Sequence, residues 1–227
     1  MERLLRAKYH TVHQILAAHY GCPVWKQQLS PVDELVNTIL SQSTTDHNRD
    51  LAFIALKRGF ADWVAVMEAP TESVVAAIRP AGLANQKGPR IQKALRYLME
   101  NAGQLSLDFL AELPLEEAKD WLTKIEGVGP KTAAIILLFA FGRPTFPVDT
   151  HVQRITGRIG LANPKQPPPK IQQQLESIGD PQTFYPFHLN LIRHGRELCQ
   201  ARRPACSRCF LQPHCYYYQT NYEPSSC

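Results

Sequence analysis

A short glycine-rich turn between two helical segments restricts the fold of this chain more than any other feature. The turn lies within Ile125–Ala133, which has the sequence IEGVGPKTA. Gly127 and Gly129 permit positive φ angles and close approach to the backbone, and the fixed φ of Pro130 suits the first position of a helix. We therefore expect a helix-hairpin-helix whose exposed amides lie at the positive end of a helix, a favourable place for a phosphate.

A lysine follows this turn directly and forms the first part of a candidate catalytic pair. The helix dipole disfavours the ammonium form of Lys131 and favours a neutral, nucleophilic amine. Asp149 stands at the start of the next expected helix, and antiparallel packing would bring it close to Lys131. A carboxylate there can orient the amine and stabilise positive charge that develops on a sugar. The alternatives are a solvated lysine and an aspartate that only caps its helix.

Helical periodicity dominates the rest of the chain, and few stretches alternate as a half-buried strand would. We therefore expect an all-α fold. After Ser30 and Pro31, for example, apolar residues form one helical stripe that consists of Val32, Leu35, Val36, Ile39 and Leu40. An apolar content of 44% over 227 residues is sufficient for a real core.

Charge and hydropathy favour an anionic partner and argue against a membrane. The net charge is +5. Basic residues gather in two groups, around Lys124 and Lys131 and through Arg193, Arg196, Arg202 and Arg203, although an ordinary solvated surface is the alternative. The longest apolar run, 133–141, is too short to cross a bilayer, and residues 1–21 resemble a charged amphipathic helix rather than a signal peptide. We expect a cytoplasmic protein with no membrane association.

Four of the six cysteines predict a metal centre. They have the spacing Cys-x6-Cys-x2-Cys-x5-Cys directly after a helical segment, at Cys199, Cys206, Cys209 and Cys215. Four thiolates suit either structural zinc or an iron–sulfur cube, and the spacing alone leaves both open. Four unligated buried cysteines are a poor alternative, because the loop between them is polar. Cys22 is expected to be a small core residue and Cys227 an exposed terminal thiol.

Two further segments are candidates for contact with a ligand. The polar run Ser41–Asp46 is longer than a simple helix cap needs, although it could also be a solvated turn in which Thr45 or Asp46 caps the next helix. Leu83 lies in the expected turn Ala81–Asn85. Its side chain either fills the underlying core or is held ready for insertion between bases.

Several of these motifs together resemble the endonuclease III family of DNA glycosylases. They are the segments 127–133 (GVGPKTA) and 148–151 (VDTH) and the four-cysteine spacing. The segments 40–46, 82–87 and 194–196 are also similar to that family, in the family's order. The resemblance covers most of the chain.

The resemblance implies a [4Fe-4S] cluster rather than zinc, held by the cysteine loop 199–215. It implies two helical domains with a DNA-binding groove between them. One is a central helical bundle, 30–145, which contains the helix-hairpin-helix, and the other combines 1–29 with 146–227. The expected partner is double-stranded DNA with a damaged base or an abasic site, and we expect a nucleoid-associated monomer.

The resemblance also implies an activity, base-excision repair by a bifunctional DNA glycosylase and AP lyase that acts on oxidised pyrimidines. Lys131 would attack C1′ of a flipped nucleotide, form a Schiff base and cut the strand by β-elimination, with Asp149 assisting. The alternatives are a monofunctional mismatch (T/U) glycosylase, an adenine glycosylase and a non-catalytic, redox-sensing DNA-binding module. A lysine at position 131 argues against the monofunctional enzymes.

DNA contacts are implied residue by residue, for Gly127, Gly129, Leu83, Gln42, Ser43, Arg202 and Arg203. Two positions depart from the family pattern. Glu126 places a carboxylate beside the expected phosphate site, which would weaken phosphate binding. The residue that fills the gap left by the flipped base is usually a glutamine, but alignment on Asp46 places Ser43 there and Gln42 one position earlier, so both stay candidates.

Overall fold

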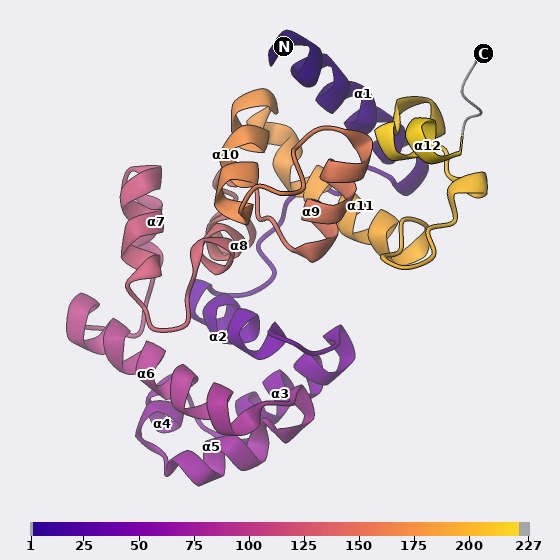
Figure 1. Ribbon diagram of the computed structural model, residues 1–227. Coiled ribbons are helices and arrows are strands. Elements are labelled where there is room, and N and C mark those ends of the chain that lie inside the picture. The colour runs from indigo at the N-terminus through magenta and orange to yellow at the C-terminus, as the bar shows by residue number, and fades with distance from the viewer. Residues whose placement is uncertain (1, 223–227) are drawn as a thin grey trace, which may run out of the picture. The chain divides into compact units, whose positions relative to one another are not determined.

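The computed structural model describes residues 2–222, and its chain forms two compact units (Figure 1). The central unit contains residues 27–141. The terminal unit combines the two ends of the chain, up to Lys26 and from Gly142 onwards. Within the described residues all regular structure is helical and no strand is present, which confirms the prediction of an all-α fold.

The central unit consists of seven α-helices, α2 to α8. Their bounds are α2 Pro31–Ser41, α3 Asp46–Gly59, α4 Trp63–Glu68, α5 Thr71–Ala77, α6 Ala84–Ala102, α7 Leu115–Thr123 and α8 Pro130–Phe141. The Ser30 side chain caps α2 by accepting a hydrogen bond from the Asp33 amide at 3.2 Å. The stripe predicted for this helix is confirmed, because all five of its apolar residues are buried.

Two helices organise the core of the central unit. α8 is apolar on nearly all sides and packs against α2 and α7, as a core helix does. α6 packs against α4 and α5 through Ile91, Leu95 and Leu98, which are fully buried. The side of α6 that is not used for this packing carries basic residues. The hairpin between α7 and α8 and the turns beside α2 and α6 are therefore held on a single core.

The terminal unit consists of the remaining helices. They are α1 Glu2–Tyr20, α9 Thr150–Ile159, α10 Pro168–Ile178, α11 Phe184–Glu197 and the short α12 Tyr216–Asn221. α11 packs against α1 and α9. Its buried Phe187 ring meets the Tyr9 ring edge to face at 4.7 Å, a favourable aromatic geometry. α11 thus joins the two ends of the chain and leads into the cysteine loop.

The prediction for Cys22 is wrong, because this residue is exposed. It follows Gly21, whose φ of +89° ends α1 and directs the chain away from the core. Cys227 lies outside the described residues. No helix in residues 2–222 is long and apolar enough to cross a membrane.

Candidate active site and metal centre

The hairpin between α7 and α8 is anchored by its apolar residues and exposes its glycines. Ile125 and Val128 are 1% and 3% exposed, and the Val128 amide donates to the Ile125 carbonyl at 3.0 Å. Gly127, between them, and Gly129, directly after Val128, are exposed. Gly127 has a φ of +86°, whereas Gly129 does not use a positive φ. The turn therefore presents backbone to solvent at the N-terminus of α8, the geometry that suits a phosphate.

Gly127 is held by side chains from two other parts of the central unit. The Gln42 Nε2 atom donates to the Gly127 carbonyl at 3.4 Å, and the Arg90 Nη1 atom donates to Gln42 Oε1 at 2.7 Å. The Arg90 chain lies so close to Gly127 that a Cβ atom there would overlap Arg90 Cδ. Gln42 and Arg90 together hold the hairpin at Gly127.

Glu126, the departure from the family pattern, is paired with a cation. Its carboxylate accepts two hydrogen bonds from Lys93 Nζ on α6, at 2.8 and 3.0 Å. Both side chains are more than half exposed, so the ion pair contributes at most about 1 kcal/mol. It nevertheless directs the negative charge toward α6.

Lys131 and Asp149 lie at the starts of two helices, as predicted. Lys131 is the second residue of α8 and is half-buried. Asp149 is the N-cap of α9, and its Oδ1 atom accepts a hydrogen bond from the Val152 amide at 2.7 Å. The capping alternative for Asp149 is therefore correct as a structural role. Lys131 belongs to the central unit and Asp149 to the terminal unit, so their cooperation stays a prediction.

The run Ser41–Asp46 combines a cap with an exposed turn. The Thr45 hydroxyl accepts a hydrogen bond from the Asn48 amide at 3.2 Å and caps α3, as one of the alternatives predicted. Gln42 is directed toward the hairpin. Ser43 is exposed and has a φ of +53°, which a non-glycine residue rarely adopts.

Leu83 does not fill the core. Its side chain is 50% exposed, and its φ is +50°. An exposed leucine in the left-handed region is costly for both its apolar surface and its backbone. Its position, at the N-cap of α6, is therefore consistent with the wedge alternative.

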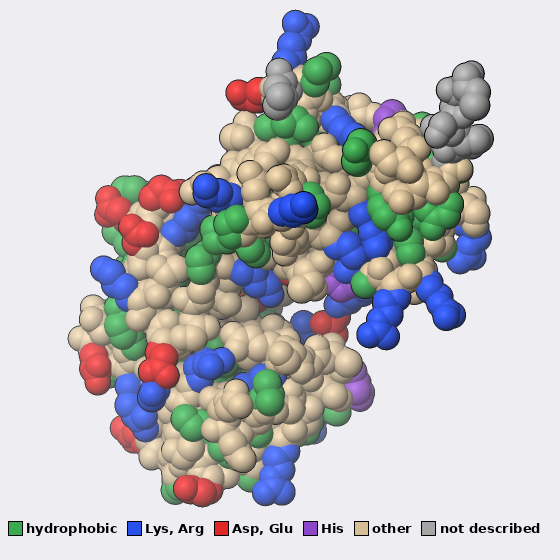
Figure 2. Space-filling view, viewed as in Figure 1, with side chains coloured by type: hydrophobic (Ala, Val, Ile, Leu, Met, Phe, Trp, Pro, Cys, Tyr) green, Lys and Arg blue, Asp and Glu red, His purple; other side chains and the backbone are tan. Residues whose placement is uncertain are grey.

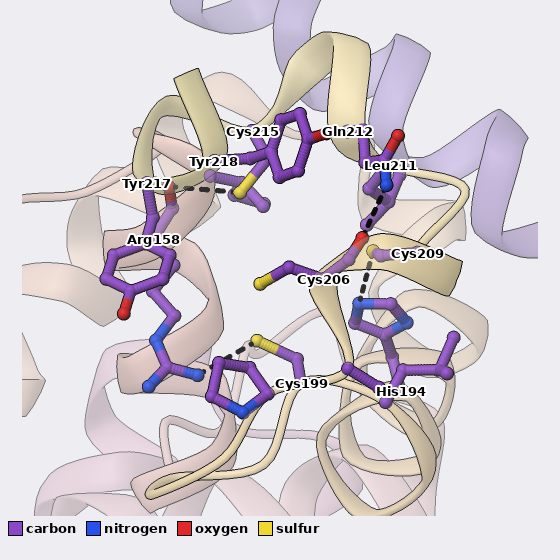
Figure 3. A pocket seen from close by; sticks show the side chains of 14 residues that line it. Arg158, His194, Cys199, Cys206, Cys209, Leu211, Gln212, Cys215, Tyr217 and Tyr218 are labelled. Atoms are coloured by element: carbon purple, nitrogen blue, oxygen red, sulfur yellow. Dashed lines mark hydrogen bonds between the residues drawn. The ribbon is translucent and has the colours of Figure 1, made fainter. Parts of the chain in front are cut away.

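The four clustered cysteines line one cavity of the terminal unit (Figure 3). Cys199 follows α11, and the other three come from the loop that leads to α12. Most of the remaining wall is apolar, with Ile159, Leu198 and Leu211 among its residues. Among the described residues, no three Cys, His, Asp or Glu side chains converge closely enough to hold one metal ion.

Two nitrogen groups approach the sulfur atoms of this cavity. The Arg158 Nη1 atom donates to Cys199 Sγ at 3.3 Å, and His194 Nε2 lies 3.7 Å from Cys209 Sγ. Burial raises the pKa of Cys209 to about 11. A buried thiol of this kind ionises readily when a metal cation compensates the charge of the thiolate. The donor set is therefore suited to a metal group.

The basic residues near the cysteine loop differ in their environment. Arg193 pairs with Glu197 at 2.8 Å and stacks over the Tyr20 ring at 4.7 Å. Arg202 and Arg203 are exposed. Figure 2 shows Lys and Arg side chains gathered over the loop after α11. This loop therefore presents positive charge to solvent.

Sequence reasoning missed the residues that support the hairpin. Arg90 and Lys93 lie on α6 with a spacing of three, which places them next to each other on a helix surface. Such a row is a detectable signal. Its targets, Gln42, Gly127 and Glu126, are distant in sequence and could not be identified from the row alone.

The two hairpin glycines make a matched pair for mutation. Gly127→Ala places a Cβ atom at a φ of +86° and against Arg90. We expect it to lower the free energy of unfolding by about 1–2 kcal/mol or more. At Gly129 an added Cβ meets no atom within 4 Å. We expect Gly129→Ala to change stability by less than about 0.5 kcal/mol. Urea unfolding of both variants without DNA tests this difference, and equal losses would contradict it.

A family model described as "HhH-GPD superfamily base excision DNA repair protein" matches residues 36–181. The chain is 30% identical over 219 residues to an endonuclease III of Sulfolobus acidocaldarius, which covers 96% of this chain and 94% of the relative. It also matches the structure of a non-covalent endonuclease III–DNA complex, with a TM-score of 0.81, 25% identity, and coverage of 95% and 97%. A trapped endonuclease III–DNA covalent intermediate matches with the same TM-score and identity, with coverage of 98% and 99%.

Proposed function

The chain belongs to the HhH-GPD superfamily of base excision DNA repair proteins, as a homologue of endonuclease III, and we propose that it removes oxidised pyrimidines from duplex DNA. The enzyme class, a DNA glycosylase and AP lyase, follows from the family. The single observation that carries the mechanism is the position of Lys131 in the first turn of α8, directly after a hairpin whose glycines are exposed. A DNA phosphate held by this hairpin would place the neighbouring deoxyribose beside the Lys131 amine.

In the proposed reaction the Lys131 amine attacks C1′ of the damaged nucleotide. The N–C1′ bond forms as the glycosidic bond breaks, and the base leaves with a proton. Opening of the sugar ring gives a Schiff base. Loss of a proton from C2′ then expels the 3′ phosphate by β-elimination, and water releases the lysine from the cleaved strand. The structural match to a trapped endonuclease III–DNA covalent intermediate supports this type of chemistry for the family.

Asp149 is proposed to assist by its negative charge. A carboxylate stabilises the positive charge that develops on the sugar before the covalent bond is complete. The hydrogen bond from the Val152 amide fixes one carboxylate oxygen and thereby orients the group. Capping of α9 and assistance in catalysis are therefore compatible roles of the same side chain.

The partner is proposed to be duplex DNA, with the two units providing different contacts. Gly127 and Gly129 bind a phosphate, and Arg202 and Arg203 attract the backbone. Leu83 is the wedge. We assign the gap left by the flipped base to Ser43, because Gln42 is already bound to Gly127 and Arg90.

The four-cysteine cavity is proposed to hold a [4Fe-4S] cluster. Cys199, Cys206, Cys209 and Cys215 provide four thiols around one cavity, the donor set that such a cluster needs. The thiols alone suit either zinc or a cube, and the relation to endonuclease III favours the cube. A bound cluster supplies a covalent cross-link of the loop that carries Arg202 and Arg203.

Lys131→Gln tests the mechanism. Borohydride reduction should trap the wild-type protein on duplex DNA with an abasic site or thymine glycol, since it reduces a Schiff base to a stable bond. We expect Lys131→Gln to abolish trapping and strand cleavage while duplex binding persists. Undiminished trapping would disprove the assignment. Base release without cleavage by the wild-type protein would indicate a monofunctional glycosylase, and binding without either reaction a non-catalytic module.

Asp149→Asn separates the two roles of this residue. Asparagine caps a helix as well as aspartate does, whereas alanine loses the cap at a cost of about 1 kcal/mol. We expect Asp149→Asn to retain the thermal stability of the wild type but to lose most of its glycosylase rate. Asp149→Ala should lose both. A normal rate for Asp149→Asn would limit Asp149 to a structural role.

Metal analysis tests the cysteine assignment. The purified protein should be brown and contain about four iron atoms per chain, as a cube requires. We expect Cys209→Ser to lower the iron content and Cys22→Ser, at an exposed site away from the cavity, to leave it unchanged. Colourless wild-type protein with one zinc per chain would refute the cluster.

A further inference from the structure

Lys87 is a charged residue in the interior of the central unit. Its side chain is only 1% exposed. The Nζ atom donates to the carbonyls of Leu40 at 2.8 Å and of Ala81 at 2.7 Å. Burial of an ammonium group is costly unless polar partners compensate it. Here the partners are two backbone carbonyls, so Lys87 joins two segments of main chain.

The two carbonyls precede the two strained turns of the central unit. Leu40 lies three residues before Ser43, and Ala81 lies two residues before Leu83. Among the described residues, Ser43 and Leu83 are the only non-glycine residues with a positive φ, +53° and +50°. Such conformations persist only where the surrounding structure holds them. The Lys87 ammonium is positioned to do this for both turns at once.

Lys87 also fixes the second turn through its own backbone. Its amide donates to the Leu83 carbonyl at 2.9 Å, while its side chain binds the Ala81 carbonyl on the other side of Leu83. The main chain around the exposed leucine is thus held at both ends by one residue. The side chain of Leu83 remains outside, half exposed.

The next two cations along α6 hold the hairpin in the same manner. Arg90 binds Gln42, which binds the Gly127 carbonyl, and Lys93 binds Glu126. Lys87, Arg90 and Lys93 follow each other at a spacing of three, so they form one continuous row on the helix. Each member of this row contacts a turn that is assigned to DNA.

We propose that this row of cations on α6 is a positioning device that holds the wedge turn, the gap-filling turn and the hairpin in a fixed mutual arrangement. Lys87 is its principal member, because it alone joins the turns of Ser43 and Leu83. The inference rests on the proposed function, in which these turns meet a duplex. Because the turns are fixed, the enzyme inserts the side chains of Ser43 and Leu83 without first ordering two loops. Preorganisation thus removes the entropic cost of that ordering.

Loss of the Lys87 contacts should therefore impair the reaction more than the fold. A displacement of about 1 Å at a distance from the reacting atoms can reduce a rate roughly 10²-fold. Lys87→Met preserves the length of the side chain and removes both hydrogen bonds. We expect single-turnover trapping on thymine-glycol duplex to slow by roughly 10²-fold, while binding to undamaged duplex changes little.

Gln92 provides a matched control on the same helix. Its side chain is also 1% exposed, and its Nε2 atom donates to the carbonyls of Val66 and Ala69, at 3.0 and 2.8 Å. The segment that it holds, at the end of α4, carries no proposed DNA contact. Gln92→Met should reduce thermal stability as Lys87→Met does, but leave the trapping rate within about twofold of the wild type, as expected for a site with no link to the reacting atoms.

The readout that separates positioning from general stability is insertion of the wedge. 2-Aminopurine next to the lesion becomes fluorescent when it unstacks. We expect Lys87→Met and Leu83→Ala each to reduce this signal, and their effects on trapping to be non-additive, because Lys87 acts through Leu83. Additive effects, or equal rate losses in Lys87→Met and Gln92→Met, would overturn the proposal.

Two further measurements cover the remaining outcomes. If Lys87→Met does not fold, Arg90→Met removes the link to Gln42 from a partly exposed position, keeps an aliphatic chain beside Gly127, and should slow trapping at an unchanged melting temperature. If the wild-type protein is not trapped at all, the proposed function fails, but the positioning device is still tested by amide hydrogen exchange. Exchange in segments 41–46 and 82–86 should then be faster in Lys87→Met than in Gln92→Met, and equal exchange would disprove the device.

Discussion

The buried ammonium of Lys87 is the interaction on which the two positive-φ turns of the central unit depend. The ammonium group donates hydrogen bonds to two backbone carbonyls instead of to water. One carbonyl lies at the end of α2 and the other at the end of the 3-10 turn before α6. These carbonyls lie at helix ends, where no amide of a continuing helix donates to them, and a nearby cation satisfies them. Without that cation, the conformations of Ser43 and Leu83 would lack their main constraint. The fold thus uses a buried charge to keep two exposed residues in place.

The hairpin follows the same physical pattern, in which hidden side chains fix an exposed backbone. Ile125 and Val128 bury their apolar surface, and Gly127 remains exposed without a side chain of its own. Arg90 occupies the space that a side chain at position 127 would need. Glycine is therefore required at position 127 both because of its positive φ and because Arg90 lies so close.

The cysteine loop of the terminal unit has little regular structure to fix its backbone, because it contains only short 3-10 turns and leads to the six-residue α12. Arg158 and His194, from α9 and α11, approach two of the sulfur atoms and connect the loop to the helical core. The metal group proposed for the four thiols would provide the order that such a loop does not obtain from secondary structure. Arg202 and Arg203 are then presented on a supported surface.

The sequence by itself determined the helices, the hairpin and the family of the chain. Apolar periodicity predicted the stripe of α2, and the order of Gly127, Pro130 and Lys131 predicted a hairpin followed by a helix, because these signals depend on neighbours along one helix or turn. Only the tertiary structure decided that Cys22 is exposed, that Gln42 supports the hairpin and that Lys87 joins two turns. The last two outcomes depend on contacts between residues more than forty positions apart, as for Lys87 with Leu40 and Arg90 with Gln42. Local patterns carry no information about which distant carbonyl a side chain will meet.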